Sequence, residues 1–286
     1  MMIPKLYILL PVHNRRGITE RFVRCLNTQS FTDYHLVLID DGSSDGTAEM
    51  VLEHIPSATV LRGNGDWWWG GSLQQGIDWL KEQKNIGEDL ILIINDDVFI
   101  EDDFLENGWK LMQGMDGTML QATIYSEKSK DILDRGMFFD AKNMTFLPAE
   151  SSEKINCLTT NGLFMVGKNL IAVGDFYPRL LPHYLSDYEF TIRAHRKGIH
   201  LLVSPDIKLW WNQETTGFRA FSKQSFLHFM KEYFSKKSAL NPFYWSSFVI
   251  LACPARYLPR HLFRIWKNAL KTIFKHARGI IFKGAQ

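Results

Sequence analysis

The chain has 286 residues, of which 45% are hydrophobic and 13% aromatic, and its formal net charge is +2. This composition excludes a disordered chain, a collagen-like repeat and a small scaffold held by disulfides. The length suits one large domain, or one domain with an appendage. Cys25, Cys157 and Cys253 show no CxxC spacing and no even framework. We therefore expect buried, reduced thiols, and neither a secreted disulfide protein nor a zinc module.

The near-neutral total charge hides an uneven distribution. Residues 1–214 contain 20 Lys and Arg against 30 Asp and Glu, a net charge of −10. Residues 215–286 contain 13 Lys and Arg against a single acid, Glu232, a net charge of +12. This split predicts an acidic body over residues 1–215 and a basic C-terminal region over residues 216–286 that meets an anionic partner.

Neither of the two longest apolar runs fits a targeting or membrane-spanning segment. The first, residues 6–12, is short and is followed at once by Asn14, Arg15 and Arg16. The second, residues 243–253, has about half the length that a bilayer crossing needs. We therefore expect no signal peptide and no spanning helix.

The first hundred residues alternate between apolar runs of strand length and stretches with apolar residues at helical spacing. The predicted strands are residues 6–12, 35–39, 59–61 and 89–94. The predicted helices between them are residues 17–29, 44–55 and 72–83. Alternation with short connections predicts βαβ units and a parallel sheet, whose ligands bind beyond the carboxyl ends of the strands.

The pattern in residues 101–210 is less regular. Helical spacing predicts helices over residues 102–113 and 186–197. Apolar runs predict strands over residues 119–125, 158–166 and 199–203, the second of them broken at Gly162. This part of the chain therefore continues the α/β pattern.

Polar clusters follow three of the predicted strands. They are Pro11-Val12-His13-Asn14, Asp40-Asp41-Gly42-Ser43 and Asn95-Asp96-Asp97. Because parallel strands end at one edge of a sheet, we expect all three clusters to face one crevice. Acids gathered there repel each other, and a bound cation or a donor-rich ligand would offset that repulsion. Helix caps and turns are the alternative roles of these acids.

In order, spacing and local structure, these clusters resemble the inverting family 2 glycosyltransferases of the GT-A fold, over roughly residues 5–215. The resemblance implies that the first two clusters hold a nucleotide at its base and ribose. The residues implied there are Pro11, Val12, Asn14 and Asp41, with Asp40 behind them. The resemblance thus implies a nucleotide sugar as the donor substrate.

The third cluster corresponds to the family's D-x-D motif, which holds a metal ion and the diphosphate. Here it reads Asn95-x-Asp97, so one carboxylate of the motif is absent. The resemblance implies that Asp97 ligates Mg²⁺ or Mn²⁺ and that Asp96 lies near the ribose or the metal. Trp210-Trp211-Asn212 stands where relatives often carry a metal-binding His. The implied metal shell is therefore thin.

Three consecutive tryptophans lie in the Gly-rich segment 63–72. Their side chains cannot all face one way, so some should line a pocket and stack on a sugar or base; packing under the sheet is the alternative. We predict that Trp69 and Gly71 contact the nucleotide sugar. Similar loops occur in a bacterial subgroup that includes rhamnosyltransferases, and the resemblance to it is looser.

The segment 183–193 resembles the family's E-D-x-D-L-x-x-R helix start, with Ser186 in place of the first acid. The resemblance implies that Asp187 is the general base, since inverting transfer needs one carboxylate that takes the acceptor hydroxyl proton. A helix cap is its alternative role. Asn161, Gly162 and His183 are predicted on the acceptor side. Glu189 and Arg193, four residues apart, predict an ion pair.

The C-terminal region changes pattern. After Pro259, which suits a helix start, apolar residues recur at three- and four-residue spacing beside Lys and Arg. The cations are Arg264, Lys267, Lys271, Lys275, Arg278 and Lys283. This pattern is typical of a helix lying in a membrane interface. Packing on the acidic body or on a second subunit is the alternative. Nucleic acid is disfavoured because no recognised motif is present and the body is acidic.

These observations predict a GT-A type α/β fold with a mostly parallel central sheet and a C-terminal helical appendage. We expect an inverting glycosyltransferase that moves a hexosyl or deoxyhexosyl group from a UDP- or dTDP-sugar to a glycan or polyprenyl-linked acceptor in surface polysaccharide synthesis. It would be cytoplasmic and peripheral at the inner face of the cell membrane, and homo-oligomer formation is left open. The alternatives are a nucleotidyltransferase, for which Arg15-Arg16-Gly17 is a weak match, and a catalytically silent sugar-binding scaffold.

Overall fold

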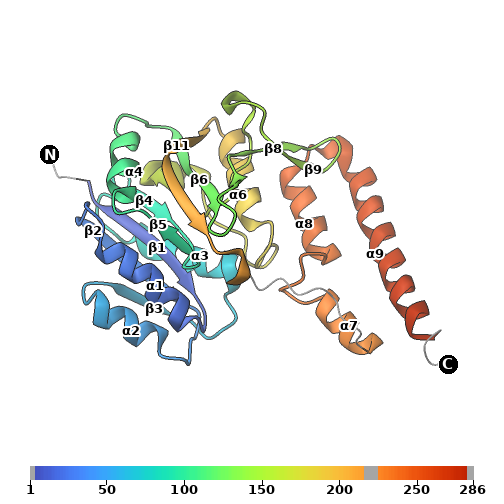
Figure 1. Ribbon diagram of the computed structural model, residues 1–286. Helices are drawn as coiled ribbons and strands as arrows, with labels where there is room; N and C mark the ends of the chain where they lie inside the picture. Colours follow the sequence, from blue (N-terminus) through green and yellow to red (C-terminus); the bar gives the residue numbers. More distant parts are fainter. Residues whose placement is uncertain (1–3, 216–224, 282–286) are drawn as a thin grey trace.

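The first ninety residues form alternating strands and helices, as the sequence predicts. The strands are β1 (Leu6–Val12), β2 (Tyr34–Asp40), β3 (Thr59–Arg62) and β4 (Leu90–Ile93), and the helices are α1 (Arg16–Asn27), α2 (Thr47–His54) and α3 (Trp68–Lys81). The computed structural model describes residues 4–215 and 225–281. The four strands pair in parallel in the order β3-β2-β1-β4 (Figure 1).

The sheet continues with strands from the middle of the chain. They are β5 (Val98–Ile100), β6 (Thr118–Ser126), β7 (Ile132–Asp134), β10 (Leu163–Val166) and β11 (His200–Trp211). β10 inserts antiparallel between β4 and β6, and β11 pairs in parallel with β6. β1, β2, β3, β4, β6 and β11 thus share one direction, against β5, β7 and β10. The predicted GT-A type, mostly parallel sheet is confirmed.

Helices cover both faces of the sheet, which explains why its strands are continuously apolar. On β1, Leu6, Ile8 and Leu10 pack with α1, α2 and α4 (Phe104–Met112). The alternate residues Tyr7 and Leu9 pack on the other face with α3, α5 (Gly167–Val173) and α6 (Ser186–Arg196). Cys25, Cys157 and Cys253 are buried free thiols, as predicted.

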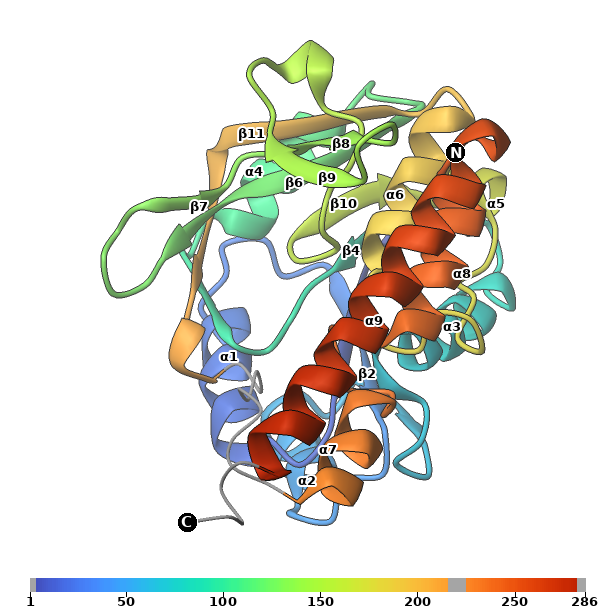
Figure 2. The ribbon, with the colours of Figure 1, turned by 90° about the vertical axis from the view of Figure 1, so that its right-hand side faces the viewer.

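A small hairpin, β8 (Met137–Asp140) with β9 (Thr145–Pro148), joins the main sheet to the C-terminal helices α7 (Phe226–Tyr233), α8 (Pro242–Ala252) and α9 (Leu258–Ile281). One apolar cluster combines Phe139 of this hairpin, Ile192 of α6, Phe248 of α8 and Ile265 of α9. Figure 2 shows α8 and α9 side by side next to α6. The C-terminal helices therefore pack on the body.

Polar contacts fix the same arrangement. The guanidinium of Arg196 donates to the Leu251 carbonyl at 3.0 Å, and the His261 ring donates to the Ala141 carbonyl at 2.8 Å. The predicted domain boundary at residue 215 is followed by residues 216–224, which lie outside the described residues. Two of the predicted cations, Lys283 and the side chain of Arg278, also lie outside them. Among the described helices, none is long and apolar enough to cross a membrane.

Three sequence-based boundaries were wrong. The helix predicted from Ser72 begins at Trp68, because Asp41 anchors the Trp68 backbone. The strand predicted over residues 158–166 begins only at Leu163, after Gly162 with φ +72°. The last strand continues to Trp211 after an irregularity between Ser204 and Lys208. Such turns and kinks leave no periodic pattern of apolar residues, so the sequence does not show where these elements begin or end.

Candidate active site

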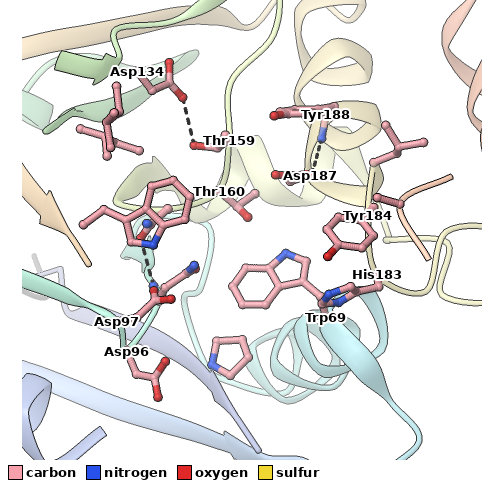
Figure 3. Close-up of a pocket in the computed structure, with 18 of the residues that line it drawn as sticks. Trp69, Asp96, Asp97, Asp134, Thr159, Thr160, His183, Tyr184, Asp187 and Tyr188 are labelled. Atoms are coloured by element: carbon pink, nitrogen blue, oxygen red, sulfur yellow. Dashed lines mark hydrogen bonds between the residues drawn. The ribbon is translucent and has the colours of Figure 1, made fainter. Parts of the chain in front are cut away.

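A cavity of about 1360 Å³ opens at the carboxyl ends of β1, β2 and β4. Its floor comes from these strand ends, and one wall comes from the start of α3. Segment 183–188, which leads into α6, and residues of β7, β8 and β9 form the opposite side (Figure 3). The crevice predicted from the three polar clusters is thus present, with residues of all three clusters in its lining.

The structure brings most of the predicted site residues together. The cavity is lined by Pro11, Val12, Asp41, Trp69, Asp96, Asp97, Asn161, His183 and Asp187. Asn14, Asp40, Gly71 and Gly162 lie outside this lining. Segments separated by more than a hundred residues along the chain therefore meet at one site.

Asp41 organises the cavity wall. One carboxylate oxygen accepts from the Gly65 N–H at 2.9 Å and the other from the Trp68 N–H at 2.9 Å. Asp40 is fully buried and accepts from the Ser43 N–H at 2.8 Å. Its carboxylate therefore holds the turn after β2 and does not line the cavity.

Asn14 links the first two polar clusters. Its side-chain oxygen accepts from the Ser44 N–H at 2.8 Å, and its own N–H donates to the Ser43 hydroxyl at 2.9 Å. Asn14 has a φ of +50°, a strained value for a residue other than glycine. Neighbouring His13 donates to the Asp41 carbonyl at 2.6 Å. The turn after β1 is therefore held by the segment that follows β2.

The three tryptophans face different ways, as predicted. Trp67 and Trp69 pack against the core, and Trp68 and Trp69 line the cavity, so Trp69 does both. Gly71 is a packing residue, because a Cβ there would lie 3.2 Å from the Cβ of Trp67. Gly70 donates to the Pro182 carbonyl at 2.9 Å, which docks the start of α3 on the segment leading to Asp187.

Two buried carboxylates follow β4. The Nε atom of Arg15 lies 3.2 Å from Asp96, and its Nη2 atom lies 3.2 Å from Asp97. Asp96 also accepts from the Thr19 hydroxyl at 2.8 Å. Burial raises the pKa of Asp96 to about 6, against the opposing effect of Arg15. Both acids stand at the strand end that the resemblance assigns to the diphosphate.

The side chains around Asp97 show whether this site could bind the metal ion that the resemblance implies. Within the described residues, no three His, Cys, Asp or Glu side chains are grouped to hold an ion. Two strand-end carboxylates still fit a hard cation that takes the rest of its shell from a diphosphate and water, as Mg²⁺ commonly does. The site therefore suits an ion that arrives with its nucleotide better than a resident one.

Asp187 lies across the cavity from these acids (Figure 3). Burial and, to a smaller extent, the nearby Asp134 raise its pKa to about 6, against the opposing effect of backbone hydrogen bonds. Its carboxylate accepts from the Tyr188 N–H at 2.9 Å. Leu185, two residues before Asp187, has a φ of +70°, so the backbone is strained just before the helix that carries this side chain. A carboxylate of this kind can take a proton near neutral pH.

Asp134 is a cavity residue that the sequence did not reveal. It lies at the end of β7 and accepts from the Gly136 N–H at 2.8 Å and from Gln121 at 3.1 Å. Burial raises its pKa. No motif surrounds it in the sequence, and its strand is only three residues long, so no periodic signal marks it.

Several polar atoms at the cavity have no hydrogen-bond partner within the described chain. Burial lowers the pKa of His183 to about 4, so its ring is neutral at pH 7, and its Nδ1 atom is unpartnered. The Trp68 ring meets it edge to face at 5.7 Å. Similar buried, unpartnered atoms are Asn95 Oδ1, Thr160 Oγ1 and Trp211 Nε1. Such atoms are free to bond to water or to a polar ligand that enters the cavity.

The basic C-terminal region contributes to the site, which its sequence pattern did not indicate. Lys237, Ala239 and Trp245 line the cavity, and Lys236 pairs with Asp66 at 2.6 Å next to the tryptophans. By contrast, Glu189 and Arg193 form a buried pair outside the cavity lining. Their predicted ion pair is therefore structural.

The fold, with its cavity at the strand ends, defines a GT-A type protein. The chain belongs to glycosyl transferase family 2, whose description matches residues 7–171. No curated protein matches the chain significantly. Family membership shows the class of activity as glycosyl transfer, and it does not specify the sugar.

Solved structures of TarS from S. aureus share the fold. One has a TM-score of 0.61 at 15% identity, covering 92% of this chain and 54% of that one, so this chain spans about half of its length. TarS residues 1–349 with UDP give a TM-score of 0.60 at 14% identity, covering 96% and 91% of the two chains. The complex with UDP-GlcNAc gives 0.59 at 15% identity, covering 92% and 71%.

Proposed function

We propose that this protein transfers a sugar, with inversion, from a UDP- or dTDP-sugar to a hydroxyl group of a glycan or polyprenyl-linked acceptor in surface polysaccharide synthesis. One observation carries the proposal. Asp187 shares a single cavity with the strand-end residues Asp41 and Asp97, although the three lie far apart in the chain. The UDP and UDP-GlcNAc named in the TarS structures make a UDP-sugar the first donor to test.

The donor would lie along the carboxyl ends of the strands. Pro11 and Val12 border the part of the cavity assigned to the nucleotide, and the Trp68 and Trp69 rings offer flat surfaces for a base or sugar. A Mg²⁺ or Mn²⁺ ion bound through Asp97 would neutralise charge on the leaving diphosphate. Because the Trp-rich loop resembles those of rhamnosyltransferases, though more loosely, we include a rhamnosyl donor among the proposed substrates.

Asp187 would then act as the general base. The acceptor oxygen attacks the anomeric carbon from the face opposite the diphosphate, and the bond from that carbon to the diphosphate oxygen breaks. The acceptor hydroxyl proton passes to the Asp187 carboxylate, and the nucleoside diphosphate leaves with the bonding electron pair. Asn161 and His183, in the same cavity, would face the acceptor.

The C-terminal region would hold the enzyme at the inner face of the cell membrane. On α9, the side chains of Phe263, Leu270 and Phe274 are 70%, 53% and 64% exposed although the helix packs on the body. Lys and Arg side chains on the same helix would add attraction to anionic lipids. A lipid-linked acceptor would be reached from that position.

Donor turnover with product analysis tests the proposal. Wild-type protein is incubated with a panel of UDP- and dTDP-sugars, Mn²⁺ and candidate acceptors, and the released nucleotide is identified. We expect free nucleoside diphosphate, and its loss in Asp187→Asn, whereas the exposed control Asp33→Asn keeps full turnover. Release of pyrophosphate, or turnover that survives in Asp187→Asn, would contradict the assignment.

A further inference from the structure

We propose that Arg15 is a built-in competitor of the divalent cation, holding Asp96 and Asp97 until a nucleoside diphosphate takes over its guanidinium. The ion and the nucleotide would therefore bind together and not independently. This inference rests on the proposed function, because it describes how the same site receives its donor. It concerns a residue that lies three positions after β1, outside the motif that carries the carboxylates.

The contacts of Arg15 are specific. Its Nε and Nη2 atoms each lie 3.2 Å from a different carboxylate, so one guanidinium bridges two adjacent acids. The two acids are almost fully buried, at 3% and 6% exposure, whereas Arg15 is 29% exposed and lines the cavity. The Nε and Nη2 atoms that face the acids are themselves buried, so an incoming ligand would meet the exposed part of the Arg15 side chain first.

Charge explains why a competitor would act here. Two neighbouring buried carboxylates repel each other, and a guanidinium removes part of that repulsion. The first acid of the D-x-D motif is replaced here by Asn95, whose amide side chain is neutral. The two acids together with Arg15 thus carry a net charge near −1, and a cation that enters alone must compete with the two ion pairs that Arg15 makes.

A diphosphate changes this balance. Guanidinium groups bind phosphate oxygens through the same planar fork that binds carboxylates. When the diphosphate takes the guanidinium, Asp96 and Asp97 lose their internal counter-ion and attract a divalent cation more strongly. The nucleotide and the ion then bind cooperatively, with Arg15 as the group exchanged between them.

Mn²⁺ binding to the full chain, followed by electron paramagnetic resonance, tests this exchange without any turnover. Wild-type protein should bind Mn²⁺ at least about tenfold more tightly with UDP or dTDP than alone. Arg15→Gln should bind Mn²⁺ at least about tenfold more tightly than wild type in the absence of nucleotide, and the gain on adding nucleotide should shrink. Circular dichroism confirms that the variant folds.

Arg16→Gln is the matched control, because it removes the same charge from the next residue, which is exposed and outside the cavity lining. It should leave both affinities unchanged. The inference is overturned if wild type binds Mn²⁺ equally tightly with and without nucleotide, or if a folded Arg15→Gln gains no affinity for Mn²⁺ alone. The first comparison needs no variant, so it can overturn the inference even if Arg15→Gln does not fold.

Calorimetry in metal-free buffer separates this inference from the proposed function. If UDP and dTDP bind but the Mn²⁺ affinities of wild type and Arg15→Gln agree, the role of Arg15 fails and the glycosyltransferase proposal stands. If neither nucleotide binds, the proposed donor site fails, and the inference fails with it.

Discussion

The carboxylate of Asp41 accepts a hydrogen bond from the Trp68 N–H at 2.9 Å and thereby ties the end of β2 to the start of α3. Its second oxygen holds the Gly65 N–H at the same distance. Trp68 is kept at a φ of +58°, which costs a non-glycine residue free energy. Asp41 is therefore the anchor of the wall that carries the cavity tryptophans.

Asp41→Asn should lower stability and weaken nucleotide binding together. The amide offers one acceptor oxygen and one donor to two backbone N–H groups, so one of these groups loses its partner. Such a loss costs about 1–3 kcal/mol of unfolding free energy. Urea unfolding and UDP calorimetry measure the two effects, with exposed Asp33→Asn as the control. Unchanged values for both would show that the loop does not depend on Asp41.

The rate of transfer should fall as the pH drops below about 6. The base must be deprotonated to act, and burial raises the pKa of Asp187 to about 6. Below that pKa, the deprotonated fraction falls about tenfold per pH unit. A profile of kcat/KM against pH measures this limb, and a rate that stays flat down to pH 4 would contradict Asp187 as the base.

Asp134→Asn should move the acidic limb of the profile of kcat/KM against pH to lower pH. The Asp134 carboxylate is a nearby negative charge that raises the pKa of Asp187, so neutralising it lowers that pKa. Asp96 also has a raised pKa of about 6, but the charges that act on it are those of Arg15 and Asp97. A shift on Asp134→Asn therefore assigns the limb to Asp187. An unmoved limb would assign it to another group.

The sequence was most informative where strands are buried on both faces. The apolar run Leu6–Val12 and the polar residues after it predicted both a strand and its carboxyl-end site, because parallel strands deliver their ends to one edge. Asp97 and Asp187 could be singled out because the resemblance assigns them roles. The βαβ alternation places Asp97 beside the ends of β1 and β2, whereas Asp187 reaches the same cavity from α6, which follows the antiparallel β10.

The far side of the cavity could not be predicted in the same way. Residues 132–148 form short strands that leave Ile132 and Leu147 about half exposed, so no alternation of apolar and polar residues marks them. Asp134 belongs to this segment. The contribution of Trp245 was equally hidden, because a helical pattern shows which face is apolar and not what that face contacts.

Arg193→Ala should unfold the protein at much lower denaturant. Arg193 donates to both oxygens of Glu189, at 2.8 and 2.9 Å, and also to the Val173 carbonyl at 2.7 Å. Glu189 is only 2% exposed, so the substitution leaves a buried, unpaired carboxylate. Removing one partner of such a pair costs about 3–5 kcal/mol.

Urea unfolding measures this loss, and Lys154→Ala is the control. Lys154 pairs with Glu150 at the same four-residue spacing, but both side chains are exposed. An exposed pair contributes about 0–1 kcal/mol, so the control should unfold close to wild type. Equal losses in the two variants would show that burial does not set the strength of the Glu189–Arg193 pair.

Serine in place of Phe263, Leu270 and Phe274 should release the protein from anionic vesicles. These exposed side chains lie on α9, whose buried Ile265, packed on the body and α8, and Ala269, packed on α7, are left intact, so the fold should survive. Vesicle flotation of the full chain measures binding, with zwitterionic vesicles and high salt to isolate the charge contribution, which salt screens. Equal flotation of variant and wild type would contradict a membrane role for this stripe.

Size-exclusion chromatography tests the alternative role of the same stripe. If wild type elutes as a dimer and the variant as a monomer, the stripe instead joins two copies of the chain, because an exposed apolar stripe fits either a membrane or a protein surface.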